Sequence, residues 1–257
     1  MSNTLHIVIP SRYNSSRLPG KPLKLIAGKT MIERVYQQAV KSGIESICVA
    51  TDDVRIQKAV EDFGGQVVMT REDHQSGTDR LAEVSEKQGW DDDDVVINLQ
   101  GDEPLMPPEV IQFLADIAVK TDAGISTLAT PIWTMDDVFN PNIVKVVMDA
   151  TGKAHYFSRA PIPWDRDNWL AMTEEVKGKS ATPRYRHLGM YAYRVGMLKK
   201  IPTLPPCEVE KIESLEQLRP LYNGIDIQVG IIENAPDHGI DTEADLLRVN
   251  ALFSVSS

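Results

Sequence analysis

Cysteine is scarce in this chain, with only Cys48 and Cys207 among 257 residues. Two cysteines cannot form the disulfide framework of a small secreted scaffold, and their spacing does not match a metal site. Residues 1–9 lack the cationic start and long apolar segment of a signal peptide. No apolar run approaches the roughly 20 residues that span a bilayer. We therefore expect a cytoplasmic protein with reduced cysteines and no membrane insertion.

Positively charged residues are also few, with 27 Lys and Arg against 37 Asp and Glu, which gives a net charge of −10. General nucleic-acid binders are usually basic, so nucleic acid is not an expected partner. The loop at residues 11–22 opposes this background, since it carries Arg12, Arg17 and Lys21 among serines, prolines and one glycine. Loop cations also suit simple solvation, but these follow an apolar strand pattern, where open α/β sheets bind phosphorylated ligands.

Two common nucleotide motifs are missing. No G-x-G-x-x-G follows the first strand, which weighs against an NAD or FAD enzyme. Residues 27–30 (Ala-Gly-Lys-Thr) resemble the end of a Walker A loop, but Leu23 stands where that motif needs its first glycine. We interpret 27–30 as a turn leading into a helix cap. The loop at 11–22 must then bind phosphate with side chains as well as backbone amides, for which arginine forks and a lysine ammonium are suited.

Short apolar strands alternate with amphipathic helices through the first half of the chain. This rhythm predicts an α/β fold with a doubly wound, mostly parallel sheet. The expected strands are 5–10, 46–50, 66–69 and 95–99, and the expected helices are 30–41, 54–63, 77–88 and 108–120.

The rhythm loosens in the second half. We expect one domain over residues 1–257, with about 130–200 forming an inserted subregion that covers one edge of the sheet. The expected elements are strands at 124–131, 143–149, 154–159, 185–193 and 225–232, and helices at 207–222 and 242–252.

Two acidic residues are candidate metal ligands. Asp102 follows the fourth expected strand beside Gly101, a place from which a carboxylate can hold Mg²⁺ against phosphate oxygens. A glycine-aspartate pair is also a common turn signal, and the phosphate-type loop of the same sheet makes the metal the better interpretation. Asp241 precedes the last helix, where an ordinary N-cap role for Asp241 or Thr242 is the alternative.

Other polar residues suit a substrate rather than a metal. Ser76 and Gly77 precede a helix and could present backbone amides to a base or ribose, although a helix cap explains them equally well. Arg159, His187 and Tyr191 lie on expected strands of the second half, where a carboxylated or polyhydroxylated substrate would need them. A lone strand histidine, however, is more often simply hydrogen-bonded.

Taken together, the motifs resemble those of the 3-deoxy-manno-octulosonate cytidylyltransferases, or CMP-Kdo synthetases. The resemblance extends through essentially the whole chain in order. It is carried by segments 12–22, 50–52, 69–78, 98–104, 156–159, 162–163, 187–193, 215–219 and 241–242.

The resemblance implies the reaction of CTP with 3-deoxy-D-manno-octulosonate (Kdo) to give CMP-Kdo and pyrophosphate, which activates Kdo for lipopolysaccharide biosynthesis. It also implies a nucleotidyltransferase fold, a Mg²⁺ cofactor, a homodimer, and sugar-binding and dimerisation roles for the inserted subregion. In the implied mechanism the anomeric hydroxyl of Kdo attacks the α-phosphate of CTP in line, and catalysis rests on positioning and electrostatics.

Residue roles carry over position by position. Arg12, Lys21, Asp102 and Asp241 would be catalytic, the two aspartates as Mg²⁺ ligands. The nucleotide would be bound by Arg12, Ser16, Arg17, Lys21, Arg71, Ser76, Gly77 and Gln100. The sugar would be bound by Gln100, Arg159, His187, Tyr191, Glu216 and Gln217.

Four alternatives stay open at this point. The acceptor could be 8-amino-Kdo or sialic acid instead of Kdo. Segments 74–76 and 241–242 keep the pattern expected for ordinary Kdo, which favours that substrate. The chain could also be a metal-dependent glycosyltransferase that consumes a nucleotide sugar and releases no pyrophosphate, or a nucleotide-binding module without catalysis.

Overall fold

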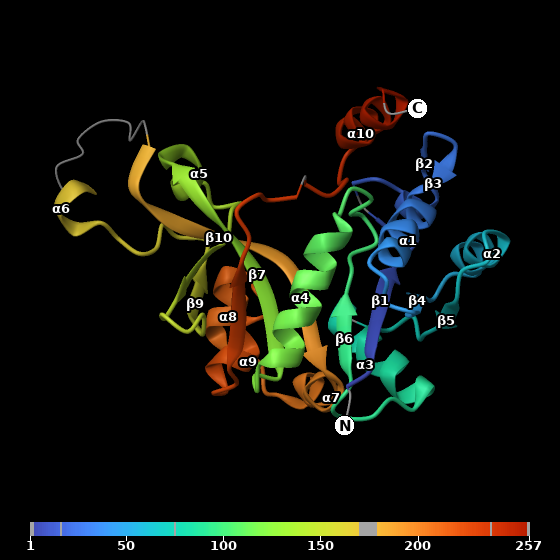
Figure 1. Cartoon of the computed structure of the whole chain (residues 1–257), viewed down its shortest axis with the longest axis horizontal. Helices are drawn as coiled ribbons and strands as arrows, with labels where there is room; N and C mark the ends of the chain where they lie inside the picture. The colour runs from blue at the N-terminus through green and yellow to red at the C-terminus, as the bar shows by residue number, and fades with distance from the viewer. Residues whose placement is uncertain (1–2, 16, 75, 170–178, 237, 256–257) are drawn as a thin grey trace.

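A computed structural model of the chain describes residues 3–15, 17–74, 76–169, 179–236 and 238–255. Its central feature is a large twisted sheet with helices on both faces (Figure 1). Across the sheet the strands are β11 (Ile227–Ile231), β7 (Ile125–Thr134), β10 (Lys179–Arg194), β6 (Val95–Asn98), β1 (Leu5–Ser11), β4 (Ser46–Thr51) and β5 (Val67–Met69).

The first half confirms the predicted parallel, doubly wound arrangement. Strand β1 pairs in parallel with both β4 and β6, and β4 pairs in parallel with β5. Apolar strand residues contact helices on alternate faces, which explains the unbroken apolar runs. The helices on one face are α1 (Met31–Lys41), α2 (Val54–Asp62) and α4 (Pro108–Lys120), and those on the other are α3 (Gly77–Gln88) and α7 (Val195–Lys200).

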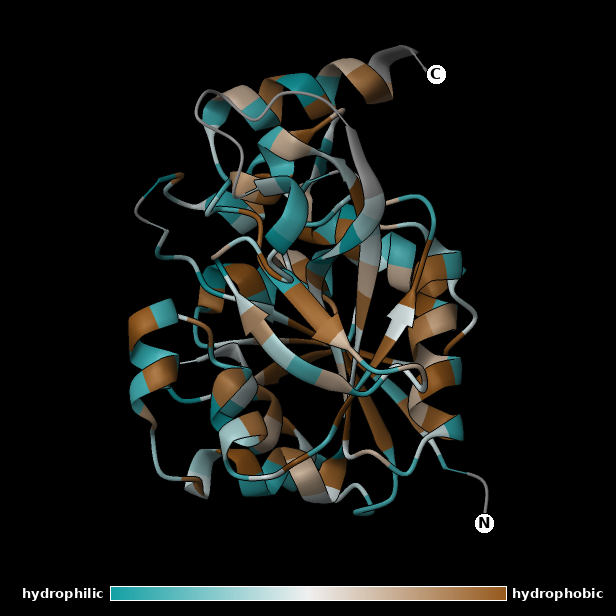
Figure 2. Ribbon diagram, turned by 90° about the vertical axis from the view of Figure 1, so that its left-hand side faces the viewer, coloured by the Kyte–Doolittle hydropathy of each residue, from teal (hydrophilic) through white to brown (hydrophobic). Residues whose placement is uncertain are grey.

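Figure 2 shows the hydrophobic strands running through the centre of the molecule between these helices. Both cysteines lie in buried positions and are free thiols, as expected. Burial raises the pKa of the Cys48 thiol to about 12. Among the described residues, no helix has the length and apolarity needed to cross a membrane.

The second half departs from the prediction, because its strands extend the sheet instead of covering an edge. Strand β10 lies antiparallel between β6 and β7, and β11 pairs in parallel with β7. The register of β10 shifts between His187 and Tyr191, at Gly189 with φ 73°. Such a bulge bends a strand. One part of β10 therefore pairs with β6, and its earlier part pairs with β8 (Lys145–Met148), which pairs with β9 (Ala154–Ser158). The limits of the inserted subregion stay a prediction.

The prediction of a single helix over residues 207–222 is wrong. Two short helices, α8 (Glu208–Glu213) and α9 (Leu218–Tyr222), are separated by a turn at 214–217. Ser214 adopts a left-handed conformation with φ 52°, and Pro220 has no backbone N–H to continue a helix from the preceding turn. Apolar spacing alone did not reveal either effect. The break matters because Glu216 and Gln217 lie in it.

The last helix, α10 (Glu243–Val255), packs far from β11, on the hairpin of β2 (Leu25–Ile26) and β3 (Lys29–Thr30) beside α1 (Figure 1). Ile26 from the hairpin, Ile240, and Leu246 and Val249 from α10 are buried in one cluster. This packing brings residue 241 back to the 11–22 loop. The remaining short helices are η1 (Lys21–Leu23), α5 (Met135–Phe139), α6 (Arg166–Trp169) and η2 (Ile201–Thr203).

Candidate active site

The predicted phosphate loop and the predicted metal ligands meet at one point. Lys21 Nζ lies 2.6 Å from Asp102 Oδ2 and 3.0 Å from Asp241 Oδ1. Arg17 Nη2 lies 3.0 Å from the same Asp241 oxygen. Gly20, with φ 67°, makes the sharp turn that places Lys21 at the start of η1. Side chains separated by 220 positions in the sequence thus line one cavity of about 390 Å³.

The two carboxylates fit a divalent cation. Because one ammonium contacts both, their oxygens converge on a common position that a cation can occupy. The described residues contain no cluster of three or more His, Cys, Asp or Glu suited to a metal. Two carboxylates are nevertheless enough for Mg²⁺ when substrate phosphates and water supply the other ligands. The residues present therefore fit Mg²⁺ bound together with a nucleotide.

Thr242, and not Asp241, fills the N-cap role that the sequence offered for either residue. Thr242 Oγ1 accepts a hydrogen bond from the backbone N–H of Asp245, so Thr242 fills the capping position of α10. The Asp245 carboxylate in turn accepts from the backbone N–H of Asp241. The Asp241 carboxylate consequently faces the cations of the loop rather than the helix.

Arg12 does more than line the phosphate cavity. Its Nη2 donates to the carbonyl oxygens of His74 at 2.7 Å and Ser76 at 3.2 Å, so it ties the loop after β1 to the segment before α3. The His74 ring is itself hydrogen-bonded to Glu83 of α3. Arg12 therefore positions the entry to α3. The predicted contact at Ser16 lies outside the described residues.

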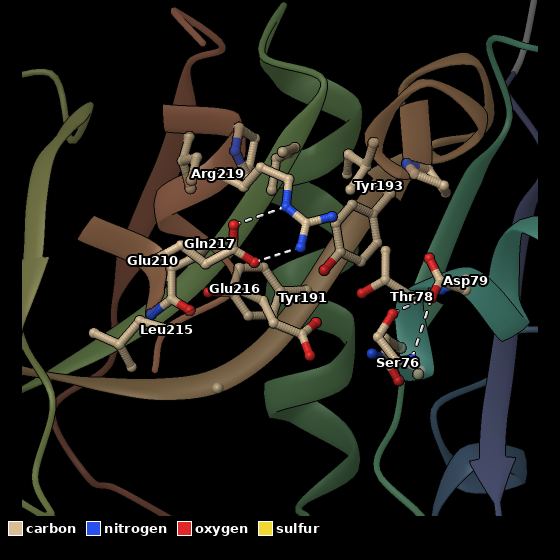
Figure 3. A pocket seen from close by; sticks show the side chains of 18 of the residues that line it. Ser76, Thr78, Asp79, Tyr191, Tyr193, Glu210, Leu215, Glu216, Gln217 and Arg219 are labelled. Carbon is tan, nitrogen blue, oxygen red and sulfur yellow. Dashed lines mark hydrogen bonds and ion pairs between the residues drawn. The ribbon is translucent and has the colours of Figure 1, made fainter. Parts of the chain in front are cut away.

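A second cavity, of about 660 Å³, is larger, and Figure 3 shows the side chains that line it. Gln100 lines both cavities, so the two form adjoining parts of one site. Seven residues of the sequence prediction line the larger cavity: Ser76, Gly77, Gln100, His187, Tyr191, Glu216 and Gln217. Ser76 also caps α3 through a capping box with Asp79, which was the alternative interpretation of that serine.

Three buried polar atoms of this cavity have no hydrogen-bond partner among the residues that the structure describes: Asn98 Oδ1, Tyr191 OH and Gln217 Nε2. The Tyr191 hydroxyl lies near Thr127, whose own hydroxyl donates to the Met190 carbonyl at 2.7 Å. Buried polar groups in native proteins are almost always satisfied. Their convergence from β6, β10 and the 214–217 turn indicates a cavity built for a ligand rich in hydroxyl groups.

His187 is neutral in this environment. Burial, followed by the nearby charge of Arg186, lowers its pKa to about 3. Its Nε2 lies 3.0 Å from the Thr127 hydroxyl oxygen and 3.3 Å from the backbone nitrogen of Gly189. A neutral imidazole has one donor nitrogen and one acceptor nitrogen. His187 therefore takes part in hydrogen bonds without carrying charge.

The 214–217 turn is fixed by a bidentate ion pair. Arg219 Nε and Nη2 lie 2.8 Å and 2.5 Å from the two carboxylate oxygens of Glu210 (Figure 3). This fork connects α8 and α9 across the turn that carries Glu216 and Gln217. Bidentate arginine pairs are among the more directional contacts in proteins.

Two predicted site residues lie elsewhere. The Arg71 side chain is 68% exposed, lies 3.5 Å from Asp73, and lines neither of the two cavities formed by described residues. Arg159 donates to the carbonyl oxygens of Glu213 at 2.7 Å and Pro141 at 3.1 Å. In the part of the chain that the structure describes, it joins β9 to α8 outside both cavities. Their assigned contacts stay predictions.

Some lining residues were missed from the sequence. Asn98 stands two positions before Gln100 at the end of a buried strand, a polar residue that could have been noticed. Tyr193 lies two positions after Tyr191, on the same face of β10, and their rings stack with centroids 5.7 Å apart. Glu210 and Arg219 gave no such signal, because only the broken helix brings them together.

The fold and site define a class of protein. A doubly wound sheet, a cationic loop after its first strand and two carboxylates converging on that loop are the features of a nucleotidyltransferase. The family model described as "Cytidylyltransferase" matches residues 6–227. The chain belongs to the 3-deoxy-manno-octulosonate cytidylyltransferase family.

Similarity to individual proteins is high over nearly the full length. The chain is 53% identical over 253 residues to a 3-deoxy-manno-octulosonate cytidylyltransferase of Hahella chejuensis, with 98% of each chain covered. It is 52% identical to the protein of that name from Aliivibrio fischeri, with 96% of this chain and 98% of that one covered. A solved CMP:2-keto-3-deoxy-manno-octonic acid synthetase complexed with CTP is 41% identical, with a TM-score of 0.89 over 99% of this chain and 100% of that one.

Proposed function

We propose that this protein transfers CMP from CTP to Kdo, releasing pyrophosphate and forming CMP-Kdo for lipopolysaccharide biosynthesis. The observation that carries the proposal is the pair of adjoining cavities that share Gln100. One is cationic and carries two convergent carboxylates, which suits a nucleoside triphosphate. The other presents unpaired hydrogen-bonding atoms, which suits a polyhydroxylated acid. The names of the relatives and the CTP complex of the similar synthetase support this assignment.

Lys21 and Arg17 bind the triphosphate in this proposal, and Asp102 and Asp241 hold Mg²⁺ in place of the contact with Lys21. When bound, Mg²⁺ neutralises charge on the phosphate oxygens. The anomeric hydroxyl of Kdo gives up its proton to water, its oxygen forms a bond to the α-phosphorus, and the bond from that phosphorus to the bridging oxygen of pyrophosphate breaks. Lys21 stabilises negative charge on the leaving group, as a positioned cation does in other phosphoryl transfers.

The larger cavity receives the sugar. Gln217 Nε2 donates hydrogen bonds, Asn98 Oδ1 and the Glu216 carboxylate accept them from sugar hydroxyls, and the neutral His187 ring contacts the sugar. Hydrogen-bond partners of this kind discriminate strongly, because an analogue that lacks a hydroxyl leaves a buried atom unpaired. Kdo is the acceptor that the relatives' names indicate, ahead of sialic acid and 8-amino-Kdo.

A pyrophosphate-release assay tests the reaction. We expect release only when CTP and Kdo are both present, across a panel of four nucleoside triphosphates with Kdo, 8-amino-Kdo and N-acetylneuraminate. Chelation with EDTA should abolish release, and added Mg²⁺ should restore it. Release from CTP alone, or equal release with sialic acid, would contradict the proposal.

We further propose a cytoplasmic homodimer. Trp133 and Trp164 are 46% and 55% exposed in the inserted subregion, with Phe139 at 37%. Large exposed aromatic side chains are enriched at interfaces between proteins. Light scattering after gel filtration should give twice the 28.6 kDa chain mass, and Trp133→Ser with Trp164→Ser should shift it toward the monomer. A native monomer would contradict the dimer.

A further inference from the structure

The contact of Asp241 with Lys21 depends on how α10 packs against the β2–β3 hairpin. Lys21 lies in η1, immediately before the β2–β3 hairpin, and Asp241 lies two positions before α10 begins. Since 220 positions separate the two residues, the chain itself does not hold them together. The backbone contact of Ile240 with Asp102 and the packing of α10 on the hairpin hold them together.

Apolar contacts provide part of that packing. Ile26 of the hairpin, Ile240, and Leu246 and Val249 of α10 form one buried cluster. Burial of this kind stabilises association but is non-directional, so it leaves the rotation and sliding of a helix weakly determined. The backbone N–H of Ile240 donates to the Asp102 carbonyl at 2.9 Å, which fixes only the entry to the helix.

Asn250 supplies the directional contacts. Its Oδ1 accepts from the backbone N–H of Ala27 at 2.8 Å, and its Nδ2 donates to the Leu25 carbonyl at 3.2 Å. The same Nδ2 also donates to the carbonyl of Leu246 within α10, at 3.1 Å. One side-chain amide therefore joins the helix backbone to both sides of the hairpin turn.

The turn that Asn250 contacts is strained. Ala27 has φ 45° and Gly28 has φ 81°. A left-handed alanine is unfavourable because its Cβ crowds the backbone, and such conformations persist only where surrounding contacts over-determine them. Here the Ala27 N–H is held by Asn250, and its carbonyl accepts from Arg34 Nη2 at 2.8 Å. The Arg34 guanidinium also lies 4.4 Å from the centre of the Phe253 ring of α10.

We propose that Asn250 is a positioning residue for the proposed reaction: its hydrogen bonds to the hairpin turn set the register of α10 and so hold Asp241 against Lys21. The inference rests on the proposed function only for its consequence, which is a complete Mg²⁺ site. The geometric claim can be tested without metal, nucleotide or turnover.

Carbodiimide cross-linking measures the geometry directly. The reagent activates a carboxylate, and the Lys21 amine then forms an amide with it, releasing the activated oxygen as a urea. Lys21 lies within hydrogen-bond distance of Asp102 and Asp241, so mass spectrometry of the two cross-linked peptides gives an internal ratio. In Asn250→Ala we expect the share of the Asp241 product to fall at least threefold relative to the Asp102 product.

A matched control lies on the same helix. Leu247 is 65% exposed, and Leu247→Ala should leave the ratio unchanged. If Asn250→Ala does not fold, Asn250→Asp serves instead, because it keeps the acceptor for Ala27 and loses both donors; its ratio should fall, but by less. A ratio in the folded variant equal to that of the native protein overturns the proposal.

Metal binding tests the consequence. Electron paramagnetic resonance of Mn²⁺ with CTP present should show affinity about tenfold weaker in Asn250→Ala, with CTP binding in EDTA unchanged. Asp241→Asn distinguishes the two claims. If it binds Mn²⁺ like the native protein, the metal role of Asp241 is wrong, while the cross-linking ratio still decides whether Asn250 positions it.

Discussion

Removing the charge of Lys21 is the sharpest test of the phosphate cavity. Lys21→Met keeps most of the apolar stem and deletes the ammonium, which is 2.6 Å from Asp102 and 3.0 Å from Asp241. Loss of one group that stabilises transition-state charge costs about 10²–10³-fold in kcat, or about 2.7–4 kcal/mol. The Lys21 side chain is only 12% exposed, so water cannot readily replace it, and we expect a loss of at least about 100-fold.

The same substitution should have the opposite effect on metal binding. Without Lys21, the carboxylates of Asp102 and Asp241 have no shared cation, so Mg²⁺ no longer displaces an ammonium when it binds. We therefore expect the Mg²⁺ concentration for half-maximal activity to stay level or fall, although kcat falls. Asp102→Asn removes one of the two proposed metal ligands and should raise that concentration while also lowering kcat.

Steady-state pyrophosphate release over a Mg²⁺ titration measures both effects. Lys24→Met is the matched control, since Lys24 is three positions away, 40% exposed and 4.0 Å from Glu243, and its kcat should be unchanged. A Lys21→Met enzyme within threefold of native kcat would refute the charge-stabilising role. Full rescue by excess Mg²⁺ would show that Lys21 acts only through the metal.

Three further predictions concern the larger cavity. Arg219→Ala breaks the fork with Glu210 and loosens the 214–217 turn. The KM for Kdo should therefore rise about tenfold or more, while the KM for CTP changes little. A parallel rise in both KM values would contradict the role of the fork. Asn98→Leu replaces a buried, unpaired oxygen with an apolar group of similar shape, so thermal unfolding should show equal or higher stability while the KM for Kdo rises. His187 has a pKa of about 3 in the folded protein, against 6.5 for an unperturbed histidine. Between these two values the unfolded state binds more protons than the folded state. The free energy of unfolding should therefore fall as the pH drops from 6.5 toward 3. Chemical denaturation across this range should show that slope reduced in His187→Asn.

The repeating part of the fold was predictable from sequence because it depends on local patterns. Apolar runs buried on both faces indicated the parallel strands, and Thr30 and Ser76 marked helix starts whose cap hydrogen bonds the structure contains. The prediction of helices and strands failed where tertiary contacts or unusual backbone conformations overrode the periodicity of apolar residues. The apolar spacing of residues 207–222 fits a helix, but Ser214 and Pro220 divide it. Apolar spacing in β10 likewise gave no sign of the bulge that lets it pair with β6 and β8.

The sequence alone determined which chemical groups are present: a cationic loop after the first strand, carboxylates at Asp102 and Asp241, and the polar side chains of His187 and Gln217 that are predicted to bind the sugar. Residue type and order along the chain are enough for that, because the carboxyl ends of parallel strands lie at the same edge of the sheet. Only the tertiary structure decided how these groups meet. The pairing of Lys21 with Asp241, the fork that supports Glu216, and the hold of Asn250 on the hairpin all join positions far apart in the chain, and no local pattern encodes the packing that closes those distances.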